Sequence, residues 1–133
     1  MREFDIETIG VIVTFENMTG TEVRDCLISE DVIYFLVNEG KIGMAIGKGG
    51  QVIKNAERTF RKQIKVLEWN PENLQFIKNM VPQAQKVNIK GDTASISITT
   101  KDRGAVIGKG GHNIKMLREL LNRNSDLKDL KLV

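Results

Sequence analysis

The residues with the clearest chemical potential are two copies of one tetrapeptide, Gly-Lys-Gly-Gly, at 47–50 and 108–111. Glycine accepts positive φ angles and has no Cβ, so another molecule can approach such a turn closely. When a helix follows the turn, its first amides are unpaired and carry partial positive charge, which favours phosphate. A lysine at the tip, Lys48 or Lys109, adds a full charge. Each loop could therefore hold a nucleotide or a nucleic-acid backbone.

The spacing of the glycines excludes the common nucleotide-binding motifs. A P-loop has four residues between its glycines and a Ser or Thr after the lysine. Here three residues separate Gly43 from Gly47, and glycine follows both lysines. The dinucleotide fingerprint also fails, because no glycine stands three residues after Gly49 or Gly110. An enzyme that binds a nucleotide at these loops is therefore disfavoured.

Two interpretations of the loops remain. In the first, glycine only shapes a corner between two helices, and a duplication would copy an inert corner as well. In the second, each loop clamps the backbone of a single strand, as a GXXG loop does with about four nucleotides. The same isoleucine, Ile46 or Ile107, precedes both loops, and this recurrence favours the clamp.

The loops belong to a longer repeat with a shift of 61 residues, in which Gly43–Gly50 aligns with Gly104–Gly111. The apolar positions after the first loop (Ile53, Ala56 and Phe60) align with those after the second (Ile114, Leu117 and Leu121). Their spacing places each set on one helix face. The chain is therefore predicted to be two modules, residues 1–69 and 70–133.

Each module is predicted to contain the elements α-β-β-α-loop-α-β. For the first module we expect helices at 5–18, 41–46 and 52–61 and strands at 23–29, 32–37 and 64–69. For the second we expect helices from 70 to 81, 103–107 and 113–122, and strands at 86–89, 93–99 and 127–133. Asn70 before Pro71 is typical of a helix N-cap. Because almost no linker separates the modules, we expect them to be rigidly joined, with Trp69 packed at the junction.

These loops and this element order resemble a known domain. Ile46–Gly50 and Ile107–Gly111 resemble KH signatures, and α-β-β-α-α-β is the order of the type II KH fold, an α+β architecture. The stretches Glu22–Ile28 and Trp69–Ala84 resemble the NusA transcription termination/antitermination family. Bacterial members carry a polymerase-binding domain and an S1 domain before their KH pair. This chain resembles the short archaeal-type proteins that keep only the pair.

The resemblance and the loops together predict a single-stranded RNA-binding surface. The RNA-binding residues that we expect are Ile46, Gly47, Lys48, Gly49, Gly50, Gln51, Lys54 and Arg58 in the first module, and Ile107, Gly108, Lys109, Gly110, Gly111, His112 and Lys115 in the second. Base edges are expected beside the last strand of each module, near Val66 and Leu130.

Charge is distributed unevenly along the chain. Residues 1–40 contain two basic and nine acidic residues, whereas residues 41–133 contain 18 basic and eight acidic ones. A local basic field favours a polyanion. Family resemblance adds RNA polymerase or the elongation complex as a partner. A ribosome-associated or RNA-processing KH adaptor is the alternative function.

The rare residues limit the chemistry further. One cysteine, Cys26, and one histidine, His112, exclude internal disulfides, multi-Cys metal sites and His-pair zinc motifs. Cys26 lies in an apolar run and is expected to be buried. With no convergent base, nucleophile or metal cluster, we expect no catalysis and no cofactor. Charged residues at the start of the chain, including Arg2 and Glu3, argue against a signal peptide. A cytoplasmic monomer without membrane contact is the expectation.

Overall fold

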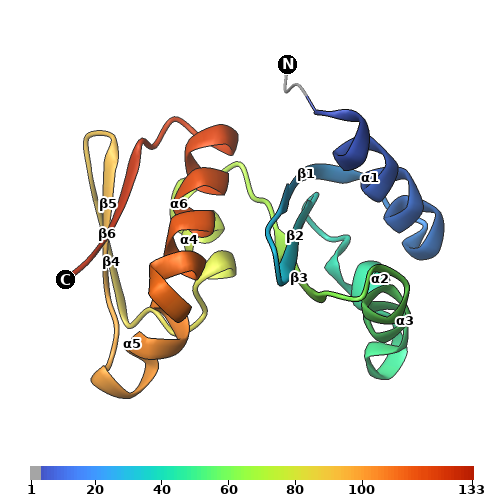
Figure 1. The fold of residues 1–133 in the computed structure, drawn as a ribbon. Coiled ribbons are helices and arrows are strands. Elements are labelled where there is room, and N and C mark those ends of the chain that lie inside the picture. Colours follow the sequence, from blue (N-terminus) through green and yellow to red (C-terminus); the bar gives the residue numbers. More distant parts are fainter. Residues whose placement is uncertain (1–3) are drawn as a thin grey trace. The chain divides into compact units, whose positions relative to one another are not determined.

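The computed structural model describes residues 4–133, so Arg2 and Glu3, which contribute to the charge at the start of the chain, lie outside the described residues. The chain divides into two compact units, Met1–Trp69 and Asn70–Val133. Each unit has its own three-stranded sheet, and the helices of a unit cover one face of that sheet (Figure 1).

The first unit contains α1 (Ile6–Thr19), β1 (Val23–Ile28), β2 (Val32–Val37), α2 (Ile42–Ile46), α3 (Gln51–Phe60) and β3 (Gln63–Glu68). A single turn of 3₁₀ helix, Lys48–Gly50, joins α2 to α3. In the sheet, β1 pairs antiparallel with β2, and β2 pairs parallel with β3. The two helices and the loop thus form the crossover that a parallel pair requires.

The second unit repeats this arrangement with α4 (Asn73–Met80), β4 (Lys86–Lys90), β5 (Thr93–Ser97), α5 (Thr100–Ile107), α6 (His112–Asn124) and β6 (Asp129–Leu132). Its 3₁₀ turn is Lys109–Gly111. Again the first pair of strands is antiparallel and the second is parallel. The predicted α-β-β-α-α-β order, and with it the α+β class, is confirmed in both units.

The first core lies between the sheet and its helices. It comprises Ile12 and Phe15 of α1, Cys26 of β1, Ile33, Phe35 and Val37 of β2, Ala45 of α2, Ala56 of α3 and Ile64 of β3. The rings of Phe15 and Phe35 stack with centroids 3.7 Å apart. The alternate residues of β2 face this core, as the period of a strand requires. The predicted burial of Cys26 is confirmed, with 2% of it exposed.

Helix α1 forms despite its β-branched residues, because both of its ends are capped. The Asp5 carboxylate accepts a hydrogen bond of 2.7 Å from the Thr8 amide, which is N-cap geometry. At the other end Gly20 has φ 72° and donates its N–H to Glu16 O. Left-handed glycine is the usual residue at such a C-terminus.

Two predicted helix boundaries in the second unit are wrong. Asn70 is not the N-cap of α4, because its side chain accepts instead from the Glu72 amide at 2.9 Å in a turn before the helix. Glu72 occupies the cap position. Helix α5 begins three residues before the predicted start, because the Thr99 side chain accepts from the Asp102 amide and caps an additional turn.

Trp69 makes a specific contact within the first unit. The Arg24 guanidinium carbon lies 3.6 Å from the centroid of the Trp69 ring. The Trp69 amide donates to Val37 O at 2.8 Å, which continues the pairing of β3 with β2. A cation–π contact of this kind stabilises a partly exposed ring. Trp69 is thus engaged within its own unit.

Candidate nucleic-acid interface

The first loop is a corner between two helices. α2 ends when Gly47 adopts φ 79° and ψ 168°, and its N–H donates to Gly43 O at 2.9 Å. The chain then passes through Gly49 at φ 63° and Gly50 at φ 75°, both left-handed, before α3 begins at Gln51. Three non-helical glycines within four residues therefore make the corner.

The second loop has the same backbone conformation. Gly108 has φ 77° and ψ 173°, Gly110 has φ 62° and ψ 20°, and Gly111 has φ 77° and ψ 13°. The corresponding values for Gly49 are φ 63° and ψ 20°. The repeat seen in the sequence is therefore a repeat of backbone geometry at the level of single residues.

The glycines of each loop have different physical roles. A Cβ on Gly47 would lie 2.4 Å from Val52 Cγ2, and one on Gly108 would lie 2.6 Å from Asn113 Cβ. Glycine is thus required at the first position of each loop, because the backbone there lies against the first turn of the next helix. A Cβ on Gly49 or Gly110 would meet nothing within 4 Å. The third residue of each loop therefore faces open space.

The hydrogen bonds of the corner leave the loop tip accessible. Gly50 N–H donates to Gly47 O at 3.1 Å, and Gln51 N–H donates to Lys48 O. The described bonds of the corner thus use the amides of Gly47, Gly50 and Gln51 and not those of Lys48 and Gly49. The second loop repeats both bonds, from Gly111 to Gly108 O and from His112 to Lys109 O. Amides at a helix start with this arrangement can bind an anion.

The predicted basic residues lie at the surface around each loop. Lys48 and Lys109 are exposed at the loop tips, and Lys54 and Lys115 are exposed on the first turns of α3 and α6. Arg58 is also exposed, one turn further along α3, and donates to Asn55 Oδ1 at 3.0 Å. The isoleucines before the loops, Ile46 and Ile107, are half-buried.

The residues directly after the loops differ between the units. Gln51 is exposed, whereas its counterpart His112 is half-buried, with a buried Nε2 that has no hydrogen-bond partner among the described residues. Asn113 donates its side-chain amide to Val106 O at 2.8 Å and so ties α6 to the end of α5. In the first unit Val52 occupies that position and can make no such bond.

Comparisons with known proteins identify the fold of both units. The KH domain family model matches residues 11–78 and 74–131, which together cover most of the chain. "Probable transcription termination protein NusA" of Methanococcus vannielii is 36% identical over 98% of this chain and 79% of its own length. The protein of the same description from Methanocaldococcus jannaschii is 32% identical over 96% of this chain and 73% of its own. The chain belongs to the NusA family.

A solved structure has a similar fold. The crystal structure of APE1850 has a TM-score of 0.76 and 30% sequence identity to this chain. The match covers 98% of this chain and 100% of the APE1850 chain. The family model and the relatives confirm the resemblance to the NusA family with tandem type II KH domains, which the loops and the junction suggested.

The side chains of the two strand residues near which base edges are expected pack into the protein. Leu130 of β6 is fully buried. Val66 of β3 packs against the first core. Lys62, two residues after the end of α3, donates its ammonium group to Ser29 O at 2.8 Å and closes the β1–β2 turn. The position of base edges in the groove beside these strands stays a prediction.

The bond from Asn113 to Val106 O is a site feature that sequence reasoning missed. The signal was available, because the repeat aligns this asparagine with Val52, and a polar residue in place of an apolar one indicates a new partner. Within residues 4–133, no three His, Cys, Asp or Glu residues are grouped so as to hold a metal ion. No described helix has the length and apolar character needed to cross a membrane.

Proposed function

We propose that this chain binds single-stranded RNA through both GXXG loops and acts as a transcription termination/antitermination factor of the NusA type. Membership of the NusA family and two KH domains support RNA binding and a role in transcription termination. In this proposal residues 1–69 and 70–133 are the two KH domains, and the chain acts as a monomer.

One observation carries the proposal: two loops share one backbone conformation directly before a helix, and in each the lysine and the amides of the second and third loop residues lie outside the described bonds of the corner. A corner needed only for folding would require its first glycine, which closes on the next helix. The open glycine is favoured by its positive φ of 62–63°, and its absent side chain also leaves room for a ligand.

In the proposed mechanism each loop holds phosphates and the neighbouring residues hold the strand. The amides of Lys48 and Gly49 donate to phosphate oxygens, and the lysine ammonium adds charge. Ile46 and Ile107 form an apolar floor before each loop. Lys54, Arg58 and Lys115 add phosphate contacts, and Gln51 and His112 hydrogen-bond the RNA. If each KH domain takes about four nucleotides, the pair takes about eight.

The decisive experiment titrates single-stranded RNA and DNA into wild type and two double variants, Lys48→Asp/Gly49→Asp and Lys109→Asp/Gly110→Asp. Both changes should fold, because Asp tolerates the left-handed region and both glycines face open space. We expect each variant to weaken RNA binding, and wild-type affinity to fall as salt rises. Folded variants that bind as well as wild type would show that the loops are structural corners.

The β4–β5 turn offers a matched control. Lys90-Gly91 is also a Lys-Gly pair, its glycine has φ 62°, and a Cβ there would meet nothing within 4 Å. Lys90→Asp/Gly91→Asp therefore makes the same chemical change, with the same change in net charge, away from both loops. We expect this variant to retain most of the wild-type affinity. An equal loss in all three variants would attribute binding to overall charge.

Association with RNA polymerase is the part of the proposal that rests on the family alone. Tagged protein should co-purify with RNA polymerase after nuclease treatment, and should not co-purify with ribosomal subunits. Recovery of ribosomal subunits instead would favour an adaptor role in ribosome function.

A further inference from the structure

Helix α1 is apolar on two opposite faces. One face packs into the first core through Ile12 and Phe15. The other carries Ile6, which is 89% exposed, and Ile9 and Val13, each 49% exposed. Residues three and four apart are neighbours on a helix surface, so these three form one continuous row. We call this row the α1 stripe.

Folding of the first unit does not account for the α1 stripe. β-branched residues lower helix propensity, and an exposed one gains little burial to compensate. Gly10 lies beside the stripe, and a Cβ added there would meet nothing within 4 Å. Glycine inside a helix costs about 1 kcal/mol relative to alanine. An exposed apolar row beside a glycine, which has no side chain, allows another helix to approach closely.

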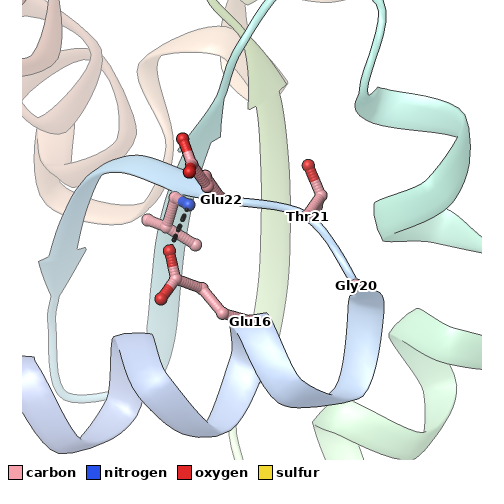
Figure 2. A pocket seen from close by; sticks show the side chains of 5 residues that line it. Glu16, Gly20, Thr21 and Glu22 are labelled. Atoms are coloured by element: carbon pink, nitrogen blue, oxygen red, sulfur yellow. Dashed lines mark hydrogen bonds between the residues drawn. The ribbon is translucent and has the colours of Figure 1, made fainter.

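An acidic hollow lies at the C-terminal end of the same helix. It has a volume of about 390 Å³ and is lined by Glu16, Gly20, Thr21, Glu22 and Val23 (Figure 2). Glu16 stands two turns after Ile9 and therefore continues the line of the stripe. Its Oε2 accepts from the Val23 amide at 2.8 Å, which fixes the side chain at the wall of the hollow.

The electrostatics of the hollow are suited to a cation. Thr21, which also lines the hollow, is 6% exposed. The C-terminal end of a helix carries partial negative charge, which adds to the charges of Glu16 and Glu22. A lysine or arginine side chain has both the charge and the reach for this position.

We propose that the α1 stripe and the acidic hollow together form a docking surface for an amphipathic helix of another protein, one with an apolar row and a Lys or Arg at one end. The rise of an α-helix separates Ile6 from Glu16 by about 15 Å. The partner therefore needs about three turns between its first apolar anchor and its basic residue.

Charge distinguishes this occupant from the alternatives. Residues 4–23, which contain the stripe and the hollow, include four acidic residues (Asp5, Glu7, Glu16 and Glu22) and no Lys or Arg, so RNA and an anionic membrane would both be repelled. A second copy of the chain would bring the same acidic residues to the other side of the contact. A basic amphipathic helix is the occupant whose charge complements the surface. The surface shares no residue with the loops at 47–50 and 108–111, so the proposal goes beyond RNA binding.

The test uses synthetic helical peptides of 14 residues or about four turns. One carries a leucine row flanked by lysines, and its control has glutamate in place of every lysine. Calorimetry gives the affinities, and NMR shifts of the amides of residues 6–23 locate the contact. The variants are Ile9→Ser, Val13→Ser and Glu22→Gln. The matched control is Ile89→Ser, which changes an exposed isoleucine of β4 in the other unit.

We expect the lysine peptide to bind wild type and Ile89→Ser alike, and each α1-stripe variant to lose about tenfold in affinity. Glu22→Gln should weaken the lysine peptide alone. RNA binding by Ile9→Ser should be unchanged, which keeps this test independent of the loops. Equal binding of the two peptides, or wild-type binding by Ile9→Ser and Val13→Ser, would overturn the proposal. So would a wild-type dimer in sedimentation that Val13→Ser converts to a monomer.

Discussion

The first and third residues of the first loop, Gly47 and Gly49, allow a direct separation of folding from binding. Gly47→Ala and Gly49→Ala make the same chemical change two residues apart. At Gly47 the added methyl group would lie 2.4 Å from Val52 Cγ2 and 2.9 Å from Val52 N. At Gly49 it would meet nothing within 4 Å. We therefore expect the first change to act on stability and the second on RNA affinity.

The magnitudes follow from the two environments. Gly47 has φ 79° and ψ 168°, a region that is essentially reserved for glycine and costs other residues about 1–3 kcal/mol. Overpacking adds about 1–3 kcal/mol, so we expect Gly47→Ala to lose about 2–6 kcal/mol of unfolding free energy. Gly49→Ala incurs a left-handed cost of about 1–2 kcal/mol, partly offset by a stiffer unfolded chain.

The assay can use Trp69 as a reporter, because it is the only tryptophan and lies in the first unit. For a unit of this size, each kcal/mol lowers the unfolding midpoint by about 4–8 °C. Gly47→Ala should therefore lower the midpoint of the Trp69 transition by about 10 °C or more, and Gly49→Ala by much less. Gly108→Ala, the matched change in the second unit, should leave the Trp69 transition nearly unchanged.

RNA titration completes this comparison. Gly49→Ala should weaken binding at a temperature where the variant is fully folded, since its methyl group occupies the open space at the loop tip. The reasoning is refuted if Gly47→Ala and Gly49→Ala destabilise the first unit equally, because the contact with Val52 would then impose no constraint.

Three other changes test contacts outside this pair. Arg61→Gly should stabilise the first unit by about 0.5–1 kcal/mol in urea unfolding. The reason is that Arg61, with φ 55°, is the one non-glycine residue of 4–133 with positive φ. An unchanged unfolding midpoint would mean that the arginine backbone is unstrained. Asn113→Val should cost the second unit about 1 kcal/mol through loss of the bond to Val106 O, measured by circular dichroism, and a stabilised variant would contradict that account. The bond from the Thr8 amide lowers the pKa of Asp5 below its ordinary value of 3.8. The stabilisation by the Asp5 carboxylate is therefore fully present above pH 3.8 and is lost as the pH falls through the lowered pKa. Asp5→Ala should destabilise the first unit at neutral pH and have the same stability as wild type in acid, measured by thermal unfolding at several pH values.

Much of the fold was predictable because one module occurs twice. The repeated loop fixed the alignment, and apolar spacing then predicted the elements of both units. The failures were local. At Asn70 the side chain caps a turn that contains Pro71, since Asx turns compete with helix capping for the same acceptor. At the start of α5 the Thr99 side chain caps a turn that lies before the predicted helix, because it accepts from the Asp102 amide.

The sequence predicts which residues belong to the site but not the separate role of each residue. The sequence presents three glycines per loop as equivalent, and only the backbone geometry separates the one that closes the corner from the one that faces open space. Likewise, Lys62 looks like any surface lysine until its ammonium group is placed 2.8 Å from Ser29 O. Contacts between residues distant in sequence decide such roles.

The parallel pairing of β2 with β3 has a consequence for the order of folding. β3 can join its sheet only after residues 38–62 have closed a loop, and closing such a loop carries an entropic cost that slows folding. The glycine corner lies inside that segment and reverses its direction. We expect the corner to be largely formed in the transition state, so that Gly47→Ala slows refolding of the first unit more than it speeds unfolding. The loop proposed to hold RNA would then also act as the folding nucleus of its domain.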